Sequence, residues 1–126
     1  MAKRNPSKQI CHCGSELTYE ACCAPLIRGD HPALTAENLM RSRYSAYVEH
    51  NESYILDTWH ASTRPETLSL KSDPAVKWSR LKIINSTDNT VEFMAWFKIN
   101  GKADKLHENS RFIHEKGRWF YLDASQ

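Results

Sequence analysis

The chain has 126 residues, 40% of them hydrophobic and 25% charged, and its formal net charge is +2 at neutral pH. This length predicts one globular unit with at most a small appendage, and the composition excludes disordered and fibrous classes of protein. The sequence contains no apolar run long enough for a transmembrane helix or a signal peptide, so we expect a cytoplasmic protein. A nucleic-acid-binding domain is normally strongly basic, and this small charge therefore argues against nucleic acid as a partner.

All the cysteines of the chain fall in the N-terminal segment ICHCGSELTYEACCAP, as Cys11, Cys13, Cys22 and Cys23. Disulfides within the Cys-x-Cys and Cys-Cys pairs would be strained, and pairing across them requires an oxidising compartment. Four thiolates around one tetrahedral Zn²⁺ ion use every thiol and leave no open coordination position. The spacing favours one structural zinc ion; a redox or oxidised role and ligation by His12 are the alternatives.

The segment that follows the first cysteine pair predicts a short helix. Ser15 is a suitable N-cap for a helix over residues 16–21, whose far end would deliver the second cysteine pair. The next stretch, PLIRGDHPAL, contains two prolines and a glycine and predicts a linker with a boundary near Arg28. We therefore expect a zinc-binding module over residues 1–28 and a second domain over residues 29–126.

The second domain begins with predicted helices. Thr35 caps AENLMRSRYSAYVEH, in which apolar residues recur at helical spacing. A short helix is expected over residues 53–59, and Pro65 suits the first turn of another helix, PETLSL.

After Pro74 the pattern changes to strands. KWSRLKIINS and TVEFMAWFKIN alternate with a period of two residues, and KLHENSRFIHE and GRWFYLDA follow after Asn-Gly and Lys-Gly turns. Short turns predict antiparallel pairing, so helices followed by an antiparallel meander make an α+β fold. Met94 and Trp96 share the outer face of the second strand. They are candidates for a homodimer interface through the sheet or for a surface covered by the zinc module.

Two resemblances extend this interpretation. CHCGSELTYEACC resembles the SEC-C motif, a zinc module also found at the C-terminus of the translocation ATPase SecA, with Glu16 and Ala24 in place of common glycines. TAENLMRSRYSAYV, TWHASTRP and LHENSRFIHEKGRWFYLD resemble the YchJ family, whose main domain is NTF2-like. The resemblance covers essentially the whole chain. It implies a cone in which a curved antiparallel sheet wraps around helices and encloses a cavity.

These features favour two classes of function. The first is a non-catalytic zinc-binding protein, an adaptor that docks a protein of the secretion, chaperone or translation machinery, as the resemblance to the SecA module implies. The second is small-molecule binding or catalysis in the cone cavity, for which the candidate residues are His60, His107, Arg111, Arg41 and Tyr44. Arg43, Trp59 and Glu108 are further polar or aromatic candidates. Strand alternation points Glu108 away from His107, and no nucleophile stands beside a base, so the sequence favours a binding protein over an enzyme.

Overall fold

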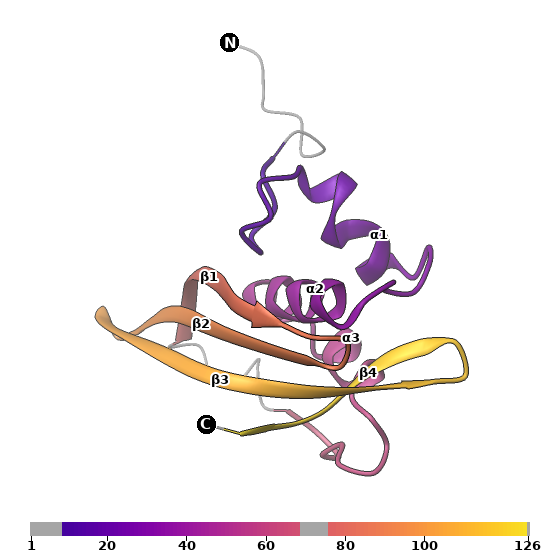
Figure 1. The fold of residues 1–126 in the computed structure, drawn as a ribbon. Coiled ribbons are helices and arrows are strands. Elements are labelled where there is room, and N and C mark those ends of the chain that lie inside the picture. The colour runs from indigo at the N-terminus through magenta and orange to yellow at the C-terminus, as the bar shows by residue number, and fades with distance from the viewer. Residues whose placement is uncertain (1–8, 69–75, 126) are drawn as a thin grey trace.

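The computed structural model describes residues 9–68 and 76–125, which form a layer of helices packed on one curved four-stranded sheet (Figure 1). The helices are the 3₁₀ helix η2 (Tyr19–Ala21), α1 (Cys23–Arg28), α2 (Ala36–Val48) and α3 (Glu52–Asp57). The strands are β1 (Val76–Ser86), β2 (Thr90–Ile99), β3 (Lys102–Glu115) and β4 (Arg118–Ser125). No helix within these described ranges is long and apolar enough to span a membrane.

The sheet follows the order of the chain, β1-β2-β3-β4, with every neighbouring pair antiparallel. Both residues of the Asn100-Gly101 turn have positive φ angles of 51° and 80°, as a tight hairpin turn requires. The Lys116-Gly117 turn repeats this conformation between β3 and β4. The α+β class and the antiparallel meander are therefore confirmed.

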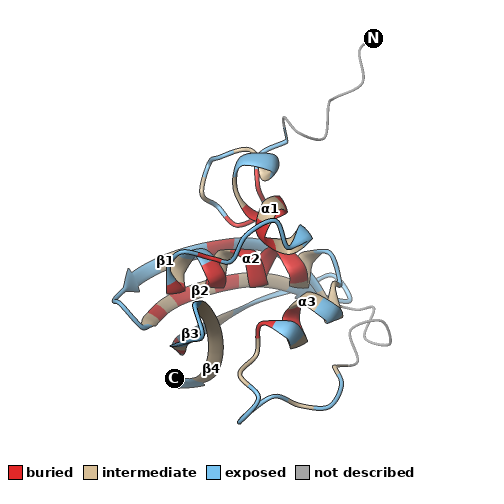
Figure 2. Cartoon of the chain, turned by 90° about the vertical axis from the view of Figure 1, so that its right-hand side faces the viewer, coloured by how far each residue is buried: buried red, intermediate tan, exposed pale blue. Residues whose placement is uncertain are grey.

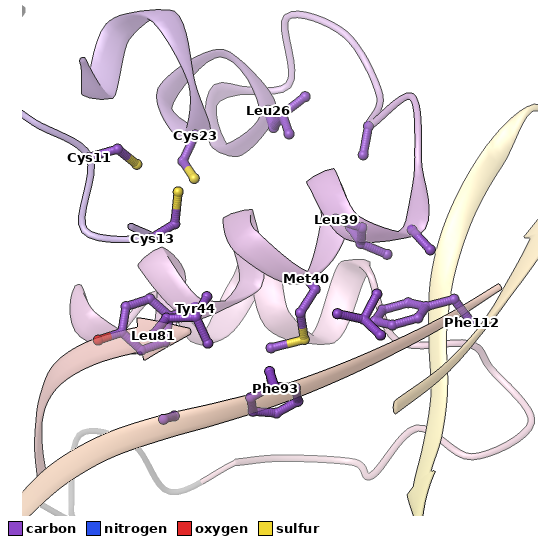
Figure 3. Packing of buried hydrophobic residues seen from close by; sticks show 14 residues of the cluster. Cys11, Cys13, Cys23, Leu26, Leu39, Met40, Tyr44, Leu81, Phe93 and Phe112 are labelled. Carbon is purple, nitrogen blue, oxygen red and sulfur yellow. The ribbon is translucent and has the colours of Figure 1, made fainter. Parts of the chain in front are cut away.

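Helix α2 packs on the concave face of the sheet and supplies much of the core. The Thr35 side chain caps its start by accepting a hydrogen bond from the backbone N–H of Asn38 at 3.0 Å. Buried residues run along the helix (Figure 2), and they pack against apolar side chains of the sheet (Figure 3). The cluster includes Leu39, Met40 and Tyr44 from α2 and Leu81, Val91, Phe93, Ala95 and Phe112 from the strands.

Arg43 joins the helices to the last strand from within the core. Its guanidinium is buried, and Nη1 donates hydrogen bonds of 2.8 Å to the carbonyl of Ile55 and to Oγ1 of Thr58. The same guanidinium lies 4.6 Å from the ring centre of Tyr121 on β4. Backbone hydrogen bonds of 2.8 Å from Tyr121 to Thr58 and from His60 to Tyr121 fasten the end of the helical layer to that strand.

Several expectations differ from the structure. The stretch expected as a linker from Pro25 begins inside helix α1, which ends at Arg28. Residues 65–68 are not helical, and the remainder of the helix expected after Pro65 lies outside the described residues. On the outer face of the sheet, Met94 and Trp96 are half-buried, and the guanidinium of Arg80 lies 4.6 Å from the Trp96 ring. The cysteine segment packs on the far side of α2 (Figure 1), so it does not cover these residues.

The contacts of Thr58 predict a measurable loss of stability when its hydroxyl is removed. Thr58 accepts from Arg43 and donates to the Tyr54 carbonyl at 2.8 Å, so Thr58→Val leaves a buried guanidinium short of one acceptor. We expect the free energy of unfolding in urea to fall by about 1–3 kcal/mol. The control Thr67→Val, at an exposed position, should change it by less than about 0.5 kcal/mol. Equal effects would show that the Arg43–Thr58 contact contributes no stability.

Candidate metal centre and cavity

The four cysteines of the N-terminal segment converge on one point. Each offers a sulfur, and all four sulfurs lie within 4.8 Å of one another, with Cys13 3.5 Å and Cys23 3.9 Å from Cys22. All four are free thiols, and three of them are buried. Figure 3 shows the sulfurs of Cys11, Cys13 and Cys23 directed toward a common space beside α2. This cluster could hold a metal ion.

A small hairpin, not a helix, positions the first cysteine pair. Ile10 bridges Thr18, and the Cys11 N–H donates to the Leu17 carbonyl at 2.8 Å. Glu16 has a φ angle of 70°, which is incompatible with a right-handed helix. The helix expected over residues 16–21 is therefore wrong: only the 3₁₀ turn η2 forms, capped by Thr18. Cys22 follows η2 directly, and Cys23 is the first residue of α1.

Hydroxyl groups approach two of the sulfurs. Ser15 Oγ lies 3.2 Å from the sulfur of Cys22, and Ser45 Oγ on α2 lies 3.6 Å from that of Cys11. Arg41, also on α2, donates from Nη1 to the Cys13 carbonyl at 2.7 Å and pairs with Glu37 at 3.1 Å. Groups hydrogen-bonded to ligands in this way orient them and stabilise thiolate charge. Helix α2 is thus part of the centre although it carries no ligand.

The thiols influence one another's ionisation. Hydrogen bonds from the thiols of Cys11 and Cys23 hold the pKa of Cys13 well below its usual value. Burial raises the pKa of Cys22 to about 11, and hydrogen bonding to Cys11 raises that of Cys23. These shifts favour a thiolate at Cys13 that accepts hydrogen bonds from neighbouring thiols. Ionisation of all four thiols requires a cation among them.

The cysteine segment and the sheet share one core. Cys11, Cys13 and Cys23 belong to the same buried cluster as residues of α2 and the strands. Gly14 approaches β1 so closely that a Cβ atom on it would lie 2.8 Å from the carbonyl oxygen of Leu81. The division of the chain near residue 28 stays a prediction, because the apolar packing is continuous across it.

A second feature is a cavity of about 290 Å³ between α2 and the concave face of the sheet. Its charged lining residues are Arg43 from α2 and Glu108 from β3, and burial raises the pKa of Glu108 above its usual value. Six of its lining residues are aromatic: Tyr44, Tyr47, Trp59, Trp78, Phe93 and Tyr121.

Of the five pocket residues expected from the sequence, the structure brings only Tyr44 to this cavity. His107 and Arg111 lie on exposed positions of β3, where they pair with Glu92 at 2.7 Å and with both carboxylate oxygens of Asp123. The remaining two residues also lie outside the cavity. His60 pairs with Glu115 at 2.9 Å, and Arg41 donates a hydrogen bond to the carbonyl of Cys13. Side chains alternate between the two faces of β3, so Glu108 shares the cavity face with Leu106 and Ser110 while His107 lies on the opposite face. This alternation is the sequence signal that could have selected Glu108 over His107.

Comparisons with known proteins agree on the family. Residues 35–124 match the family model described as YchJ, middle NTF2-like domain. A UPF0225 protein of Chromobacterium violaceum is 45% identical, over 98% of this chain and 98% of its own length. A UPF0225 protein of Deinococcus radiodurans is 42% identical, over 96% of this chain and 92% of its own length.

Two solved structures of SEC-C motif containing proteins have the same fold. The solution structure of the one from Rhodopseudomonas palustris is 31% identical, with a TM-score of 0.81 over 91% of this chain and 96% of that protein. The crystal structure of the one from Psychrobacter arcticus is 28% identical, with a TM-score of 0.74 over 94% of this chain and 82% of that protein.

The position of Gly14 predicts that Gly14→Ala destabilises the chain more than a matched substitution does. Gly14 and Gly101 have φ angles of 81° and 80°, so alanine costs about 1 kcal/mol at either position through the backbone alone. Only Gly14 also meets a backbone atom, while a Cβ on Gly101 meets nothing within 4 Å. We expect Gly14→Ala to lower the free energy of unfolding by at least about 1 kcal/mol more than Gly101→Ala in urea denaturation. Equal losses would mean that the cysteine hairpin does not depend on this approach to β1.

Proposed function

The chain belongs to the YchJ family of NTF2-like proteins, and we propose that it is a non-catalytic zinc-binding protein whose cysteine module docks another protein. The convergence of four thiols on one buried point carries this proposal. A cytoplasmic location is part of the proposal, because a reducing compartment keeps clustered thiols available for a metal ion.

The dimensions of the cluster suit one zinc ion. Zn–S bonds of about 2.3 Å put the sulfurs at the corners of a tetrahedron with edges of about 3.8 Å. The distances of 3.5 Å and 3.9 Å from Cys22 to its neighbours are close to that edge. Four sulfur ligands leave no position for water or substrate, so the ion would be structural. Soft thiolates also select zinc over magnesium or calcium.

Zinc binding predicts the composition of the purified protein. Native mass spectrometry of the full chain should find one zinc ion per chain and no thiol that reacts rapidly. Cys22→Ser should lose the zinc and at least about 3 kcal/mol of unfolding free energy, because metal binding contributes directly to folding. The matched variant His12→Ala, which alters the residue between two ligands, should retain the metal. Zinc loss from His12→Ala would make that histidine a ligand, and a metal-free chain with disulfides or four reactive thiols would contradict structural zinc.

A groove beside the cysteines is the proposed docking surface. This knuckle groove, about 170 Å³ in volume, is lined by the exposed side chains of Leu17 and Leu34 together with Pro25, Cys22 and Cys23. Leu17 is 53% exposed and Leu34 is 77% exposed, so both side chains present apolar surface to the solvent. A short apolar segment of a partner protein would cover them. The resemblance of the motif to the SecA module favours a partner from the secretion, chaperone or translation machinery.

Docking through the knuckle groove predicts which surface substitutions abolish partner capture. In quantitative pull-downs with the full chain, the double variant Leu17→Ser/Leu34→Ser should reduce the specific partners at least about tenfold, because it removes two apolar contacts. Ile84→Ser/Ile99→Ser is the matched control, since these exposed residues lie on the sheet away from the groove.

Both double variants should keep one zinc ion, which separates docking from metal binding. Retention of every partner by the groove variant would contradict the proposal. Loss of partners only in the sheet control would move the docking surface to the sheet.

A further inference from the structure

The cavity under α2 contains a buried positive charge that the described fold does not neutralise. Arg43 is 3% exposed, and among the described residues no carboxylate lies within ion-pair distance of it. Nη1 donates to neutral oxygens of Ile55 and Thr58, and the Tyr47 hydroxyl is a further neutral hydrogen-bond partner of the guanidinium. A guanidinium has five N–H donors, so this one has donors left for a ligand. Burial without a counter-charge is costly and favours an anion beside it.

The walls of the cavity favour a flat apolar ligand. Tyr44, Trp78 and Phe93 line one part, and Trp59 and Tyr121 line the part nearest the guanidinium. The volume of about 290 Å³ equals that of about ten water molecules at ~30 Å³ each. It lies near the lower limit for ligand pockets. One aromatic ring with short substituents fits this space.

Polar groups come from two walls of the space. Arg43 comes from α2 and Glu108 from β3, and both line the cavity together with Tyr47 and Tyr121. Among the described residues, no ion pair joins Glu108 to the guanidinium. A ligand in this space can therefore contact a guanidinium from one wall and a carboxyl group from the other.

We propose that this cavity binds a small aromatic carboxylic acid. Its carboxylate pairs with Arg43, and its ring lies against the aromatic walls. The other end of the ring carries a hydrogen-bonding substituent directed toward Glu108. Arginine matches a carboxylate with two parallel hydrogen bonds. The aromatic walls alone also suit a quaternary ammonium ion. The buried guanidinium repels such a cation, so the anion is favoured. The site is separate from the metal centre and does not depend on the proposed docking function.

The test uses 4-hydroxybenzoate as the probe and the full zinc-loaded chain as the protein. In a ¹⁵N NMR titration up to about 10 mM, we expect saturable shifts of the Trp59 and Trp78 indole signals with a dissociation constant of about 1 mM or tighter. The signal of Trp96 on the outer face of the sheet should not move. The neutral analogue 4-hydroxybenzyl alcohol should bind at least about tenfold more weakly, because it lacks the carboxylate.

Two variants locate the site. Ala95→Leu fills the cavity from β2, and Arg43→Lys keeps the charge but removes the planar fork; each should weaken binding at least about tenfold. If Arg43→Lys does not fold, Ala95→Leu still decides. Arg80→Gln is the matched control, because this arginine also lies over a tryptophan but on the outer face of the sheet. Its dissociation constant should equal that of the original chain.

Three results would overturn the proposal. They are the absence of saturable shifts with 4-hydroxybenzoate, unchanged binding in Ala95→Leu, and equal or tighter binding of benzyltrimethylammonium or of the neutral alcohol. The ammonium result would assign a cation site to the same walls.

Discussion

Helix α2 is buried from two sides, and the positions of both sites follow from that burial. Arg41 and Ser45, four residues apart, face the cysteine segment. Met40, Arg43, Tyr44 and Tyr47 line the cavity on the side of the sheet. A helix with polar contacts on one side and aromatic contacts on the other cannot rotate without losing both sets. The Thr35 cap at its start and the packing of its apolar residues hold it in this rotation.

This arrangement makes the cysteine segment part of the domain's core. Three cysteines lie in the same apolar cluster as Leu39, Met40 and Leu81, and the hairpin that carries the first pair touches β1 at Gly14. A segment as short as residues 9–28 buries too little apolar surface to fold by itself. It gains order from two sources, contact with α2 and the convergence of its thiols. Any ion among those thiols therefore stabilises the packing of α2 as well as the hairpin.

The sequence predicted the parts of the fold that local chemistry decides. The helix after Thr35, the four strands and the Asn100-Gly101 turn follow from capping, alternation and turn chemistry, and the cysteine spacing indicated a common site. The helix expected over residues 16–21 failed because Glu16 adopts a positive φ angle and the backbone around it pairs with the segment before Cys11. The further candidates Arg43, Trp59 and Glu108 line the cavity with Tyr44. The other four candidates, His60, His107, Arg111 and Arg41, lie elsewhere because their positions depend on rotation about α2 and on pairing across strands. His107 and Arg111 find carboxylates on neighbouring strands, which no local pattern reveals.

Tyr44 is influenced by both sites. It lines the cavity, and its pKa is raised to about 12, first by burial and then by the negative charge of Cys13. Its phenol therefore stays neutral at physiological pH. The two sites consequently differ in chemistry although they share a helix. Soft sulfur ligands form a closed centre on one side, and a guanidinium among aromatic rings faces an open volume on the other. The closed centre suits a structural role, and the open volume is where a ligand has space to bind.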